Sequence, residues 1–252
     1  SKVGHLSVNH RGRLSGPVAR QSNVVQYTTP TLSGFNATLS YSPNSEAAQA
    51  GQNTDARIWG ATARWSGGPF GAQIDWAQNT AASPAVGQRP EATGLKALAG
   101  WNYMPGAQLS AIWIRLENEV GTAQSGTIPG PQAGFSVAGD SLRQEGWGLS
   151  WEHTFGNVQA LAQFGQLGNV KGCGAGGNCS NTKATSYMVG GRYLLSKRTW
   201  LYATYNETRN QSNQNLDYVA AGQSSITNTG FTPNLPGGAD PRIWALGVFH
   251  AF

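Results

Sequence analysis

The chain has 252 residues, of which only 12% are charged, and its formal net charge is +5. Soluble domains carry about 25% charged residues, and no stretch here approaches the roughly 20 consecutive apolar residues of a transmembrane helix. With 34 Gly and 9 Trp, the composition disfavours both a soluble domain and a helical membrane protein, and it is typical of a membrane β-barrel.

The N-terminal segment, residues 1–20, shows no strand pattern. It contains Lys2, Arg11, Arg13 and Arg20 but no acidic residue. The four charges therefore form a locally basic stretch ahead of the first strand. The basic balance of the chain does not indicate nucleic-acid binding, because its charges are scattered and do not form a stripe interleaved with stacking aromatics.

After this segment, apolar and polar residues alternate with a period of two. The pattern is clearest at 35–41, where Phe, Ala, Leu and Tyr alternate with Asn, Thr and Ser. Similar stretches follow at 59–65, 70–76, 95–101, 147–151, 158–164, 189–195 and 244–248. Successive side chains of a strand point to opposite faces, so the pattern predicts about eleven strands with one apolar and one polar face. In 108–118 both the odd-numbered and the even-numbered residues include large apolar side chains. The pattern therefore does not determine on which face of the sheet Arg115 lies.

Short and long connections alternate along the chain. Short turns rich in Gly, Pro, Ser and Asn lie at 30–34, 66–69, 104–107, 155–157 and 196–198, and long polar stretches lie at about 44–55, 80–92, 118–141, 168–183 and 210–240. Membrane barrels have short periplasmic turns and long extracellular loops, whereas a soluble sandwich does not require its loops to sort by end. The sequence therefore predicts an all-β, transmembrane antiparallel β-barrel.

The polar residues of the alternating pattern are predicted to form the pore wall. A polar lining keeps water in a pore, and its charges set the ion preference. The candidate lining residues of the strands are Gln26, Arg64, Asp75, Lys96, Glu152 and Arg192.

The two cysteines, Cys173 and Cys179, lie in a Gly-rich stretch. A disulfide would suit an oxidising compartment such as the periplasm or cell surface, and two free thiols are the alternative. A metal site is the weakest interpretation, because no further Cys or His lies nearby to complete four ligands.

Three segments resemble the general porins of Gram-negative bacteria, in the branch typical of β-proteobacteria. They are the strand at 20–30 (RQSNVVQYTTP), the Leu-Ser-Lys-Arg-Thr turn at 195–199 and the C-terminal GVFHAF at 247–252. The resemblance implies that 1–20 is the pore-constricting third loop, with Arg11, Arg13 and Arg20 near the narrowest point. It implies that 21–252 is the C-terminal eleven strands of one barrel domain of sixteen strands, of which about five are lacking here.

The resemblance also implies a homotrimer in the outer membrane, in contact with lipopolysaccharide. Gly247, His250 and Phe252 would belong to a terminal signal for barrel assembly, although Phe249 stands where the family often has a basic residue. A solvated basic loop that binds lipopolysaccharide phosphates is the alternative interpretation of 1–20.

These patterns predict an outer-membrane porin, a passive channel for small hydrophilic solutes with a preference for anions. The alternative is a barrel-anchored surface adhesin or receptor that acts through its extracellular loops. No catalytic motif such as Gly-x-Ser-x-Gly or His-Glu-x-x-His occurs. We therefore expect no enzyme activity and no cofactor.

Overall fold

The structure is a computed structural model that describes residues 24–43, 57–80, 91–119, 141–173, 178–214, 216 and 237–251. The predicted constriction loop with Arg11, Arg13 and Arg20, and also the terminal Phe252, lie outside these residues. No helix in the described ranges is long and apolar enough to cross a membrane.

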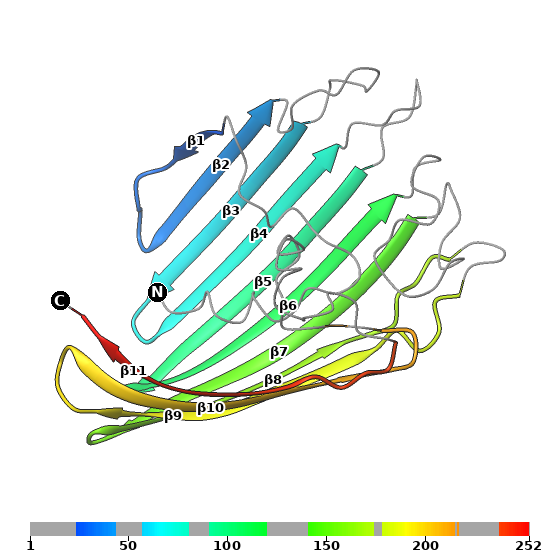
Figure 1. Cartoon of the computed structure of the whole chain (residues 1–252). Coiled ribbons are helices and arrows are strands. Elements are labelled where there is room, and N and C mark those ends of the chain that lie inside the picture. The colour runs from blue at the N-terminus through cyan, green and yellow to red at the C-terminus, as the bar shows by residue number, and fades with distance from the viewer. Residues whose placement is uncertain are drawn as a thin grey trace.

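The described residues form one antiparallel sheet in which each strand pairs with its neighbours in sequence (Figure 1). The strands are β1 (Val25–Thr28), β2 (Phe35–Pro43), β3 (Arg57–Gly67), β4 (Phe70–Thr80), β5 (Glu91–Met104), β6 (Ala107–Glu119), β7 (Ser141–Phe155), β8 (Val158–Leu167), β9 (Ala184–Leu194), β10 (Thr199–Asn210) and β11 (Arg242–His250). The predicted all-β antiparallel fold is confirmed. The strands curve into a trough, and β1 and β11 are its two edges.

Tight turns at one end of the trough depend on glycine. Gly34, between β1 and β2, has φ +83°, a left-handed conformation that side chains with a Cβ rarely adopt. A Cβ at this position would lie 2.1 Å from the carbonyl oxygen of Ser66, near the end of β3. Close packing of this turn against the end of β3 therefore explains why glycine occupies this position.

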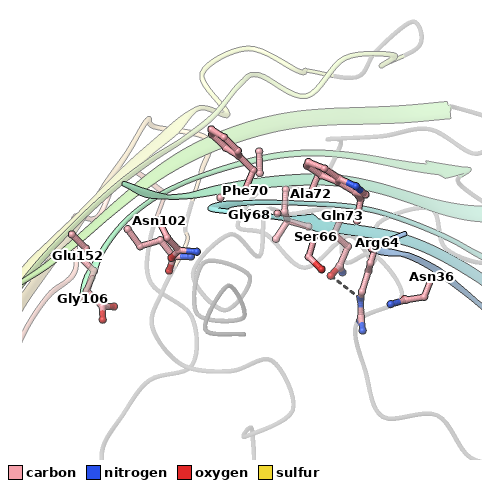
Figure 2. Close-up of a pocket in the computed structure, with 18 of the residues that line it drawn as sticks. Asn36, Arg64, Ser66, Gly68, Phe70, Ala72, Gln73, Asn102, Gly106 and Glu152 are labelled. Atoms are coloured by element: carbon pink, nitrogen blue, oxygen red, sulfur yellow. Dashed lines mark hydrogen bonds between the residues drawn. The ribbon is translucent and has the colours of Figure 1, made fainter. Parts of the chain in front are cut away.

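The strand register fixes the two faces of the sheet. Thr62 pairs with Asp75, which pairs with Lys96, so these polar residues share one face. Phe70 pairs with Trp101 on the opposite face. Figure 2 shows polar residues of the first face directed into the trough, so this is its concave face.

The convex face is exposed and mostly apolar, with charged residues such as Arg57 and Glu145 toward the long-loop ends of its strands. Val25, Trp244 and Leu246 are 72%, 77% and 79% exposed. Aromatic pairs lie near both strand ends of this face, for example Phe70–Trp101 beside the short turns and Tyr205–Trp244 farther from them. Such aromatic girdles mark the two interfaces of a membrane barrel.

The register also shows which residues of β6, the strand that contains the ambiguous segment 108–118, lie on each face of the sheet. Trp113 pairs with Ala97 and Trp147 on the convex face, which places Arg115 there as well. Ile112 and Ile114 lie on the concave face, and Ile112 is only 4% exposed. The concave face is therefore not uniformly polar, because β6 contributes apolar side chains to it.

Candidate functional site: the concave wall

A cavity opens on the concave face at the end with the short turns. It has a volume of about 740 Å³ and is lined by residues of β2 to β8 and their turns. Its polar lining includes Asn36, Arg64, Gln73, Asn102, Gln108, Glu152, Thr154 and Gln159 (Figure 2). These side chains present amide, hydroxyl, guanidinium and carboxylate groups to one space, which suits passage of hydrated solutes.

Two of the predicted wall charges neutralise each other. Lys96 Nζ lies 3.0 Å from Asp75 Oδ2, on the adjacent strand. Asp75 also accepts hydrogen bonds from the Thr62 hydroxyl (2.8 Å) and the Gln73 amide (2.7 Å). The carboxylate is thus tied into the wall by three neighbours.

Arg64 and Arg192 carry positive charge on the same wall without a carboxylate partner among the described residues. Arg64 donates through Nε to Gln73 Oε1 at 2.9 Å. Arg192 pairs in register with Gln159 on one side and lies over the ring of Trp200 on the other. Neither arginine takes part in an ion pair with a residue that the structure describes.

Glu152 is the second acidic residue of the concave wall. Its carboxylate accepts a hydrogen bond of 2.5 Å from the Gln159 amide, and both side chains line the cavity. Gln159 is also the register partner of Arg192. The structure thus brings Glu152 and Arg192 to opposite sides of one glutamine.

The remaining predicted residues are dispersed. Gln26 has concave parity but belongs to the edge strand β1, where its amide lies 3.4 Å from the Thr28 hydroxyl. Gly247 lies on the concave face of β11, whereas His250 lies on the convex face, 2.8 Å from the Thr199 hydroxyl. Gly247 and His250 therefore lie on opposite faces of β11.

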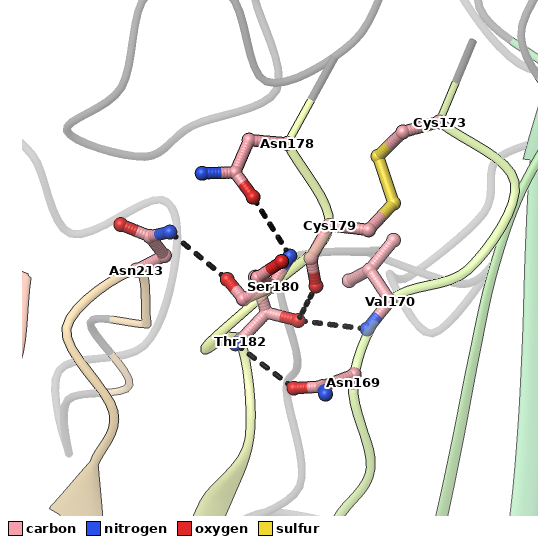
Figure 3. The surroundings of a disulfide bond; sticks show 8 residues. All are labelled: Asn169, Val170, Cys173, Asn178, Cys179, Ser180, Thr182 and Asn213. Carbon is pink, nitrogen blue, oxygen red and sulfur yellow. Dashed lines mark hydrogen bonds between the residues drawn. A yellow bond between two sulfur atoms is a disulfide. The ribbon is translucent and has the colours of Figure 1, made fainter.

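The end with the long loops carries a disulfide (Figure 3). Cys173 and Cys179 are joined, with Cα atoms 5.9 Å apart, and both pack against the buried Leu142 and Val170. The buried hydroxyl of Thr182 accepts from the Val170 amide (2.7 Å) and donates to the Cys179 carbonyl (3.0 Å). The described parts of the 168–183 loop are thereby held over the ends of β6 and β7.

Sequence reasoning missed two clusters. Trp200, Tyr202 and Phe249 gather on the concave face. The signal that could have revealed Phe249 is its opposite phase to Trp244, Leu246 and Val248 on the same strand. On the convex face, Glu207 is buried beneath Arg209 and Arg242. The sequence around Glu207 does not predict its burial, because Arg242 comes from β11, which follows β10 only after a long loop.

A curved antiparallel sheet with an apolar convex face, aromatic girdles and a polar concave face defines the wall of an outer-membrane barrel. The family model described as "Gram-negative porin" matches residues 3–213, and the chain belongs to this family. The resemblance to Gram-negative porins is confirmed, and the protein is one of the outer membrane of Gram-negative bacteria. No match specifies the β-proteobacterial branch.

Among solved structures, the chain is similar to Salmonella typhi OmpF in complex with daunomycin, with a TM-score of 0.53 and 12% identity. The match covers 90% of this chain and 62% of that one, so the chain spans less than two thirds of that porin. A match to the NanC porin has a TM-score of 0.39 and 10% identity, covering 91% and 98% of the two chains. No curated protein matches.

Proposed function

We propose that the chain forms the wall of a water-filled pore through which small hydrophilic solutes diffuse, with a preference for anions. The observation that carries the proposal is the division of one curved sheet into an apolar convex face and a polar concave face. Large apolar side chains such as Leu246 are stable on the convex face only when lipid covers them. A polar concave face keeps water inside.

The charges of the concave wall support the preference for anions. Lys96 is compensated by Asp75, which leaves Arg64 and Arg192 against Glu152. Two unit charges about 5 Å apart interact by about 3 kcal/mol at an effective dielectric near 20. A permeating anion near either arginine is therefore favoured by several times the thermal energy. The basic segment 1–20 would add to this field if it lines the narrowest point.

Further parts of the proposal rest on the family resemblance. They are a homotrimeric assembly, contact with lipopolysaccharide, and constriction of the pore by Arg11, Arg13 and Arg20. Passive diffusion requires no catalytic step and no cofactor.

The test is the zero-current potential of single channels in a planar bilayer under a KCl gradient. The wild-type protein should be anion-selective, and Arg64→Gln should move the potential toward cation preference. Arg57→Gln is the matched control, because Arg57 lies on the same strand but on the convex face. A cation-selective wild type, or an equal effect of both variants, contradicts the anion preference.

The same recording tests the pore itself. A diffusion pore gives stepwise, ohmic conductance. A barrel that serves only as the anchor of an adhesin, with its interior filled, gives none. Absence of conductance from correctly folded protein therefore rejects the pore.

A further inference from the structure

Aromatic side chains occur on the concave face of the described strands at one place, on β10 and β11. Trp200, Tyr202 and Phe249 share this face through their register. The remaining tryptophans have convex parity: Trp59, Trp65, Trp76, Trp101, Trp113, Trp147, Trp151 and Trp244. A cluster that departs from this arrangement on a water-facing wall needs its own explanation.

The three aromatic groups form an ordered platform. The rings of Trp200 and Phe249 stack with centroids 4.1 Å apart and planes 16° apart. Tyr202 lies against the backbone of Gly247, where a Cβ would come within 2.5 Å of the tyrosine hydroxyl oxygen. Glycine at 247 thus lets the tyrosine ring lie along the wall.

Part of the platform is open to solvent. Phe249 is 44% exposed and Tyr202 is 36% exposed, whereas Trp200 is half-buried. Exposed apolar area on a water-facing wall costs about 25 cal/mol per Å² relative to burial, so packing within the wall alone does not favour aromatics here. A ligand that covers the rings would recover that free energy.

A positive charge adjoins the platform. The guanidinium carbon of Arg192 lies 5.9 Å from the centroid of the Trp200 ring. Arg192 makes no ion pair with any residue that the structure describes. A guanidinium that stacks on a ring keeps its N–H donors in its own plane, where they can bind a carboxylate in bidentate fashion.

We propose that Arg192, Trp200 and Phe249 form a binding site for planar aromatic carboxylates on the pore wall. The ligand ring would stack on the exposed aromatic platform while its carboxylate pairs with Arg192. A sugar acid carries the same charge but lacks a planar aromatic face. A neutral aromatic alcohol has the face but lacks the charge. This inference rests on the proposed pore function and names a solute class for which the pore is selective.

The experiment is single-channel recording of the full protein in KCl with benzoate added, and glucuronate and benzyl alcohol as comparison solutes. Benzoate should interrupt the current at lower concentration than either comparison solute. Because a stacked aromatic pair is worth about 0.5–1.5 kcal/mol, Trp200→Leu should raise the half-blocking concentration of benzoate about twofold to tenfold. Arg192→Gln should do the same and also remove the difference between benzoate and benzyl alcohol.

Trp244→Leu is the matched control, since Trp244 lies on the convex face of β11. It should leave the block by benzoate unchanged. If Trp200→Leu does not fold, Phe249→Leu tests the same platform from the adjacent strand.

The outcomes separate the two proposals. Folded protein without KCl conductance rejects the pore. Normal KCl conductance with equal block by benzoate and glucuronate overturns the aromatic-carboxylate site alone. An equal effect of Trp200→Leu and Trp244→Leu overturns it as well, because the concave platform would then have no specific role.

Discussion

Lys96 Nζ lies 3.0 Å from Asp75 Oδ2 between adjacent strands, so two opposite charges cancel on the concave wall. Together, Lys96 and Asp75 add no net charge to the concave wall. The alternation pattern alone predicts that Lys96 attracts anions. In the structure, the nearby Asp75 carboxylate cancels the positive charge of Lys96. Arg64 and Arg192 therefore carry more of the proposed selectivity than the sequence suggests.

Replacing Asp75 with Asn should increase the preference for anions. The change removes the negative charge and leaves the ammonium group of Lys96 uncompensated on the pore wall, where confined charges act on passing ions. The zero-current potential in a KCl gradient measures the shift. Glu145→Gln is the control, because Glu145 lies on the convex face. A shift toward cations on loss of Asp75 would contradict the role given to this pair.

Glu207 should stabilise the folded barrel. Its side chain is only 5% exposed on the convex face, with Arg209 Nε at 2.9 Å and the Tyr205 hydroxyl at 2.5 Å. Arg242 lies 3.6 Å away on β11. Glu207→Gln removes the countercharge of both arginines, so the temperature at which folded protein converts to the unfolded form on detergent gels should fall.

Glu117→Gln provides the comparison for Glu207. Glu117 pairs with Arg115 on the same convex face, but its side chain is 37% exposed. Exposed ion pairs contribute about 0–1 kcal/mol, so this variant should unfold within a few degrees of the wild type. Equal behaviour of the two variants would show that burial of Glu207 carries no special stability.

The disulfide between Cys173 and Cys179 should act locally. The enclosed loop is short, and its stabilisation is therefore at most about 2–3 kcal/mol in the chain-entropy description. The double variant Cys173→Ser/Cys179→Ser should fold and conduct, while proteolysis within 168–183 becomes faster. Peptide mass mapping of the wild type should find both thiols protected until reduction. Alkylation of both without reductant would rule the disulfide out.

Deletion of Phe252 should reduce the amount of folded barrel in the outer membrane. The prediction follows from the resemblance of the C-terminal segment to the family's assembly signal. Folded and unfolded forms are separated on unheated detergent gels of outer-membrane fractions. Truncation of an equally apolar side chain outside this segment, Leu195→Ala, should leave the folded amount unchanged. Equal amounts of folded protein with and without Phe252 would contradict the assembly role.

The sequence alone determined the strands, their approximate ends and the facing of most of their residues. In 35–41 and 70–76, one parity is apolar and the other polar, and a strand turns alternate side chains to opposite faces. Parity is a local property, so no partner strand is needed to read it. The sorting of short and long connections is likewise visible along the chain.

Only the tertiary structure decided relationships that depend on register. Ile112 and Trp113 are both apolar, and pairing with β5 is what sends Ile112 to the concave face. Trp200 and Phe249 stack although a long loop separates their strands. Arg209 lies in β10 and packs on Glu207. The sequence alone predicts that a long loop begins at about residue 210, next to Arg209. Contacts between strands follow from which residues lie opposite each other, and alternation within a single strand does not contain that information.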